Sequence, residues 1–170
     1  MLLGFAGAFR RSELTALDVE DLKFNEDGMI VRVRRSKTDA EGRGEKVGIP
    51  YGSNPATCPV RALRAWLEAS EIQSGALFRG INRHGQILAE RLTSQSIAKV
   101  VKRYAEAAGL NPELYGAHSL RPGFATQADL AGAKFTDIKR QGRWKNDATV
   151  REYMQRSELF ESNAAAELGL

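Results

Sequence analysis

The chain has 170 residues, of which 42% are hydrophobic and 27% charged, as in an ordinary soluble globular protein, and this length suits one well-cored domain and is short for two. The formal charge of +4 is compatible with a polyanionic partner. A single cysteine excludes an internal disulfide. The apolar run over 2–9 is too short to span a membrane and is followed, not preceded, by basic residues, so we expect a cytoplasmic protein with no membrane partner.

Several stretches have the apolar periodicity of helices. Ser12 is a suitable N-cap, Pro59 suits the first position of a helix, and Gly109 ends an amphipathic stretch. The glycine-containing stretch 71–92 has no clear periodicity, and we assign no regular element to it. The predicted helices cover about 2–8, 12–17, 59–67, 94–108, 122–131, 135–141 and 148–156.

A short alternating stretch predicts the middle strand of a small sheet. Val31 and Val33 alternate with Arg32 and Arg34, which is the period of a strand with one buried face. Apolar residues before and after it indicate two neighbouring strands, one ending near Phe24 and one closed by the proline of 47–50. We therefore predict an α+β, mainly helical fold with a small antiparallel three-stranded sheet, as one domain over 1–170.

The residues with the most distinctive chemistry lie in the second half of the chain. His118 and Arg121 are separated by two residues, so both side chains can face one anion. The segment Gln141-Gly142-Arg143-Trp144 follows, and then Tyr153. Near the start stand Arg10 and Glu13, and Lys37 lies in a polar segment after the middle strand. Arginine suits a phosphodiester because its planar fork donates two hydrogen bonds to phosphate oxygens and stays charged.

In order and spacing, these stretches resemble the catalytic domain of the tyrosine recombinase, or phage integrase, family. The resemblance matches Arg10 and Arg121 to the catalytic arginines and His118 to the histidine paired with the second of them. It matches Tyr153 to the nucleophile and Lys37 to the hairpin lysine that acts as general acid. Trp144 stands where the family has His or Trp, and Glu13 at the acidic position that supports the first arginine.

This resemblance implies a site-specific recombinase that cleaves and rejoins DNA through a 3′-phosphotyrosyl intermediate, independently of metal ions and ATP. No metal site or cofactor is expected. The implied partner is double-stranded DNA, bound by a homotetramer that is a monomer in isolation, at the nucleoid of a prokaryote. Arg32 and Arg34, which alternate with the valines, and the neighbouring Arg35 are candidates for contacts with DNA phosphates.

Three other functions fit part of the pattern. A type IB topoisomerase-like nicking-closing enzyme would use the same residues. A metal-dependent nuclease would instead use the carboxylates of Asp18, Glu20 and Asp21, although no histidine lies near them. A catalytically impaired DNA-binding fragment is the third. The family's N-terminal DNA-binding domain is expected to be absent, and Pro122 restricts the backbone of the residue before it. We expect the helix to begin at Pro122, with Arg121 just outside it and still pointing inward.

Overall fold

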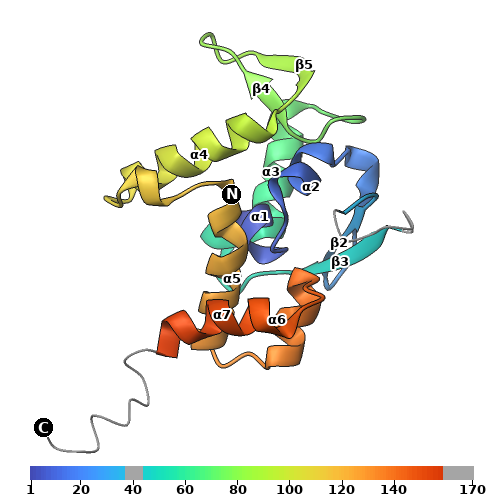
Figure 1. Cartoon of the computed structure of the whole chain (residues 1–170). Helices are drawn as coiled ribbons and strands as arrows, with labels where there is room; N and C mark the ends of the chain where they lie inside the picture. Colours follow the sequence, from blue (N-terminus) through green and yellow to red (C-terminus); the bar gives the residue numbers. More distant parts are fainter. Residues whose placement is uncertain (37–43, 159–170) are drawn as a thin grey trace, which may run out of the picture.

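The computed structural model describes residues 1–36 and 44–158, with side chains described up to 154. Helices form most of it (Figure 1). The α-helices are α1 (Leu2–Ala6), α2 (Arg11–Ala16), α3 (Pro59–Ser70), α4 (Ser94–Ala107), α5 (Leu120–Leu130), α6 (Phe135–Gly142) and α7 (Asp147–Glu158). Short 3-10 turns are η1 (Val19–Asp21), η2 (Pro55–Thr57), η3 (Pro112–Leu114) and η4 (Ala117–Ser119). In the ranges described, no helix combines the length and apolar character that crossing a membrane requires.

The predicted three-stranded antiparallel sheet is confirmed. Its strands are β1 (Leu22–Phe24), β2 (Gly28–Val33) and β3 (Glu45–Pro50), in the order β1-β2-β3. Val31 lies opposite Val47, and both are buried against the core, whereas Arg32 and Lys46 lie opposite each other on the exposed face. The strand period of two therefore concentrates positive charge on the outer face of the sheet.

The stretch to which the sequence assigned no regular element contains a second, two-stranded sheet. Strands β4 (Arg79–Ile81) and β5 (Ile87–Arg91) pair as an antiparallel hairpin. The side chain of Asn82 accepts hydrogen bonds from the backbone of His84 and Gln86, and Gly85 takes the positive φ of +79° that the turn requires. The hairpin has no clear apolar period because β5 is exposed over most of its length.

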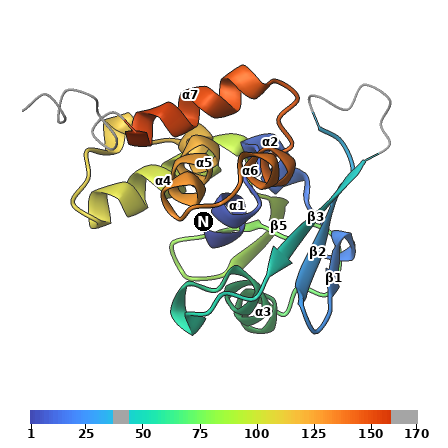
Figure 2. The same ribbon diagram turned by 90° about the horizontal axis from the view of Figure 1, so that it is seen from below.

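The core consists of two apolar clusters. The larger one joins α1, α3 and the three-stranded sheet, and Figure 2 shows α1 in the middle of the molecule, between this sheet and helices α4, α5 and α7. The smaller cluster is centred on Ala125, Ile138 and Val150, one from each of α5, α6 and α7. Trp144 and Tyr153 pack against the smaller cluster. This three-helix unit therefore fixes the position of the proposed nucleophile.

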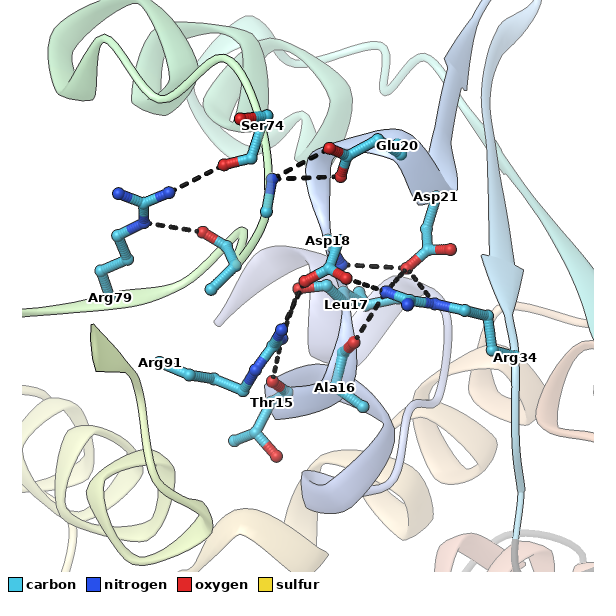
Figure 3. A network of polar contacts seen from close by, with 12 residues as sticks. Thr15, Ala16, Leu17, Asp18, Glu20, Asp21, Arg34, Ser74, Arg79 and Arg91 are labelled. Carbon is cyan, nitrogen blue, oxygen red and sulfur yellow. Dashed lines mark hydrogen bonds and ion pairs between the residues drawn. The ribbon is translucent and has the colours of Figure 1, made fainter. Parts of the chain in front are cut away.

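A network of ion pairs connects the three-stranded sheet to the β4–β5 hairpin (Figure 3). Asp18, in the turn after α2, pairs with Arg34, which directly follows β2, and with Arg91 at the end of β5. Arg34 also pairs with buried Asp21 at 2.6 Å, and Arg91 donates to the backbone carbonyl of Leu17 at 2.9 Å. Asp18 is therefore the common partner of two arginines from separate sheets.

Candidate active site

Arg10 is held in place by the start of helix α2. Arg10 is the N-cap of α2, where the sequence had suggested Ser12 two positions later. The carboxylate of Glu13 accepts the backbone N–H of Arg10 at 2.9 Å, and the same carboxylate accepts Nη1 of Arg10 at 2.6 Å. Nη1 also donates to Oγ of Ser36, just after β2, at 2.6 Å. The Glu13 side chain is only 1% exposed while that of Arg10 is 20% exposed, so a buried carboxylate fixes a guanidinium that solvent can reach.

Arg121 projects from the first turn of α5 into the interior. Its guanidinium donates to the backbone carbonyls of Ala8 and Gly142, the latter at 2.8 Å. It also lies over the ring of Trp144, 4.7 Å from the centroid, in a cation–π contact. Arg121 therefore links the turn after α1, just before Arg10, to the end of α6, just before Trp144.

Burial is the main reason why the pKa of Arg121 falls to about 10, and the positive charge of Arg10 acts in the same direction. The charges of Glu13 and Tyr153 oppose this decrease. A side chain with this pKa keeps its charge at neutral pH.

Pro122 is accommodated differently from our expectation. Helix α5 begins at Leu120, so Arg121 is its second residue and Pro122 its third, whereas we had placed Arg121 before the helix. The first four N–H groups of a helix have no intrahelical partner, so a proline in this turn sacrifices no hydrogen bond. The expectation that Arg121 points inward agrees with its burial.

Trp144 and Tyr153 face each other beside Arg121. Their ring centroids are 6.0 Å apart, with planes inclined by 60°. Gly142 allows the Trp144 ring to pack closely, because a Cβ atom at position 142 would lie 1.7 Å from it. The backbone carbonyl of Tyr153 accepts a hydrogen bond from Thr126 on α5 at 3.0 Å, which fixes α7 against α5.

Two further residues, His118 and Lys37, were predicted to be catalytic. His118 lies in η4, immediately before α5, and its side chain is exposed. Lys37 lies outside the described residues. The structure thus brings together Arg10, Arg121, Trp144 and Tyr153, with Glu13 behind Arg10.

Sequence reasoning assigned no role to Arg143, which is buried in this site. Its Nη2 donates to Oε2 of Glu13 at 2.7 Å, and its side chain is 6% exposed. The backbone of Arg143 is left-handed, with φ of +55°, and it follows the last residue of α6. The only sequence signal was the arginine directly after Gly142 and before Trp144.

The candidate DNA-contacting arginines have different surroundings. Arg32 is exposed on the outer face of β2, next to Lys46 on β3. Arg35 is exposed just after β2. Arg34, in contrast, pairs with Asp18 and Asp21, so its positive charge is balanced within the protein. DNA contact remains a prediction for all three, with Arg34 the least available.

Replacing Arg32 and Arg34 separately should therefore have different effects. Arg32→Met should weaken DNA binding and reduce the slope of log K against log salt by about 0.9 for one lost phosphate contact. Arg34→Met should instead lower the free energy of unfolding by about 1–3 kcal/mol, because it removes the partner of a buried carboxylate. Salt-dependent DNA titrations and urea denaturation of both variants test this, and equal effects on both properties would refute the distinction.

The carboxylates required by the nuclease hypothesis have other partners. Asp18 and Asp21 pair with arginines, and the carboxylate of Glu20 accepts the backbone N–H of Gly75 at 3.0 Å (Figure 3). Within the described ranges, no group of three or more His, Cys, Asp or Glu side chains is placed to hold a metal ion. These side chains act as structural links between segments.

Comparison with known structures identifies the fold. The crystal structure of XerA recombinase superposes with a TM-score of 0.65 at 22% identity, over 98% of this chain and 52% of that one. XerH site-specific recombinase, bound to palindromic difH substrate in a post-cleavage complex, gives a TM-score of 0.68 at 21% identity, over 99% of this chain and 44% of that one. The fold is therefore that of a tyrosine recombinase catalytic domain.

Sequence comparison gives the family. Residues 1–159 match the profile of the phage integrase family, and the chain belongs to this family. An integrase/recombinase xerD homolog of Selenomonas ruminantium is 43% identical over 162 residues, covering 95% of this chain and 48% of the relative. The tyrosine recombinase XerC of Syntrophus aciditrophicus (strain SB) is 28% identical over 158 residues, covering 89% of this chain and 46% of the relative. The chain thus spans about half the length of these curated relatives.

Proposed function

We propose that this chain is the catalytic domain of a site-specific DNA recombinase that cleaves and rejoins strands through a phosphotyrosine. The observation that carries the proposal is that segments distant in the sequence meet around Arg121. Its guanidinium lies over the ring of Trp144, whose centroid is 6.0 Å from that of Tyr153, and it donates to the carbonyl of Gly142. The next residue, Arg143, pairs with the Glu13 carboxylate that also holds Arg10. Two guanidinium groups next to a phenol provide charge stabilisation and a nucleophile for an anionic phosphodiester. The recombinase names of the relatives favour this function over a topoisomerase-like activity.

In the proposed cleavage step, the phenolic oxygen of Tyr153 attacks the scissile phosphorus. A bond forms between Tyr153 and the 3′ phosphate, and the bond from phosphorus to the 5′ oxygen breaks. Arg10 and Arg121 donate to the non-bridging oxygens, where negative charge increases, and His118 and Nε1 of Trp144 add donors. The phenol releases its proton to water, and Lys37 protonates the leaving 5′ oxygen.

The covalent intermediate explains how a strand is rejoined without ATP. A phosphotyrosine ester retains the free energy of the phosphodiester that it replaces. The 5′ hydroxyl of another strand can therefore attack it, which restores the DNA backbone and releases Tyr153. All the cations in this scheme are side chains, so the proposal requires no metal ion.

The proposed partner is double-stranded DNA, and the exposed positive charge of Arg32 and Lys46 on the outer sheet face supports it. Relatives of this fold have been observed on DNA: XerH with difH, and the Tn1549 transposon integrase with transposon right end DNA. We further propose assembly as a homotetramer on DNA and as a monomer without it, at the nucleoid of a prokaryotic cell.

The proposal predicts that a duplex with a nick near the cleavage site traps the enzyme as a covalent adduct, because the short strand after the nick diffuses away. Adduct yield should be the same in EDTA and in Mg²⁺, since side-chain cations stabilise the transition state. Denaturing gel electrophoresis with a labelled strand measures it. Cleavage that stops on chelation and returns with Mg²⁺ would favour a metal-dependent nuclease.

A further inference from the structure

We infer that Arg143 is a positioning residue for DNA cleavage: through Glu13, it keeps the guanidinium of Arg10 oriented and free to bind the scissile phosphate. This inference rests on the proposed function, in which Arg10 binds that phosphate. Arg143 itself is not expected to contact the DNA phosphate, because all three nitrogens of its guanidinium face protein partners: the carboxylates of Glu13 and Glu45 and two backbone carbonyls.

Two arginines share the carboxylate of Glu13. Arg10 donates from Nη1 to Oε1 at 2.6 Å, and Arg143 donates from Nη2 to Oε2 at 2.7 Å. The hydroxyl of Ser36 donates to Oε1 at 2.9 Å. With donors on both oxygens, the carboxylate is fixed in one orientation, and so is the guanidinium of Arg10 on the other side.

The other contacts of Arg143 show why it can fix this carboxylate. Its Nη1 donates to the carbonyls of Gly7 at 3.0 Å and Gln141 at 3.1 Å. Its guanidinium lies 5.1 Å from the centroid of the Phe9 ring, and its Nε is 3.4 Å from the carboxylate of Glu45 on β3. Arg143 is therefore held by α1, α6 and the sheet at once, and the residue that follows it is Trp144.

The charge of Arg143 also determines how much of the Arg10 guanidinium remains available to bind a ligand. Burial raises the pKa of Glu13, but the charge of Arg143 and the hydrogen bonds from Arg10 together lower it below its ordinary value. If Arg143 were absent, Arg10 alone would have to balance the buried carboxylate. Among the described residues, Arg10 uses only Nη1 of its guanidinium for hydrogen bonds, which leaves Nε and Nη2 for a phosphate.

The backbone of Arg143 provides a variant that removes the side chain without adding strain. At φ of +55°, glycine is more favourable than arginine, so Arg143→Gly relaxes the backbone while deleting the guanidinium. Arg143→Lys keeps the positive charge but loses the planar guanidinium and its paired hydrogen-bond donors. Arg140→Met is the matched control, because Arg140 is 79% exposed in the same helix–loop segment and its loss removes the same charge.

The experiment combines single-turnover cleavage of the nicked duplex at saturating DNA with NMR of the free protein. In Arg143→Gly, the cleavage rate constant should fall about 10²-fold, as for a catalytic group misplaced by about 1 Å, with DNA affinity unchanged. The loss should be smaller on a substrate whose scissile phosphate carries a methyl group instead of one charged oxygen. Arg143→Lys should lie between Arg143→Gly and wild type, and Arg140→Met should match wild type.

The NMR measurements do not depend on activity. In Arg143→Gly, the pKa of the Glu13 carboxyl should rise and the Nε signal of Arg10 should shift, whereas Arg140→Met should leave both unchanged. The stability that ionised Glu13 contributes is lost as pH falls through its folded pKa, so this loss should start at a higher pH in Arg143→Gly. An unchanged Glu13 titration, or a loss confined to DNA affinity, would overturn the inference. If wild type forms no adduct, the proposed function fails, and the Glu13 and Arg10 signals still decide whether Arg143 orients Arg10.

Discussion

Tyr153→Phe is expected to form no covalent adduct with a nicked duplex and to bind that duplex with nearly unchanged affinity. The substitution removes only the phenolic oxygen, which is the proposed nucleophile. The ring itself packs against Trp144, at 6.0 Å between centroids, and against the apolar cluster of α5, α6 and α7. Phenylalanine keeps these contacts, so loss of the adduct would not reflect loss of the fold.

Tyr104→Phe provides the matched control for this experiment. Tyr104 lies on α4, is 60% exposed and has no proposed role, so its variant should form the adduct at the wild-type rate. Both variants should unfold at the same denaturant concentration as wild type. An undiminished adduct in Tyr153→Phe would show that another residue attacks the phosphate.

Arg121→Lys is expected to lower the cleavage rate by about 10²–10³-fold, although it conserves the charge, because loss of one oriented donor costs about this factor. It should also lower stability. The guanidinium of Arg121 satisfies two buried carbonyls, those of Ala8 and Gly142, and lies over Trp144. An ammonium group cannot reproduce this flat fork, and each carbonyl left unpaired costs about 1–3 kcal/mol.

Single-turnover cleavage and urea denaturation of Arg121→Lys measure the two effects. Arg103→Lys, at an exposed position on α4, is the control and should change neither. Wild-type cleavage by Arg121→Lys would mean that the fork of Arg121 is not required in the transition state. A stability loss with normal cleavage would make Arg121 a structural residue alone.

The parts of the fold that the sequence predicts are those in which one face is buried. Val31 and Val33 lie in the core while Arg32 is exposed, so the alternation of β2 was readable. The hairpin of β4 and β5 was not, because most of β5 is exposed and has no apolar period. The start of α5 was placed two residues late, since proline is favourable in the first turn as a whole and does not mark one position in it.

Some residues of the candidate site could likewise be predicted from the sequence, and others could not. Tyr153, Trp144 and the Arg10–Glu13 pair could be proposed from the resemblance to the tyrosine recombinase family, and the structure links them to Arg121. The role of Arg143 could not, because its contacts with Glu13, Gly7 and Glu45 arise only when distant segments meet. For the same reason, the pairing of Arg34 with Asp18 and Asp21 could not be distinguished from an arginine facing DNA.

The most direct test of the proposed chemistry is to identify the residue and the DNA end that are joined. A nicked duplex is incubated with the protein, the adduct is digested with protease and nuclease, and the linked peptide is sequenced by mass spectrometry. We predict a 3′ phosphate on Tyr153 and a free 5′ hydroxyl on the released strand. A phosphate on another residue, a 5′ linkage to the protein, or cut strands with no attached peptide would contradict the account.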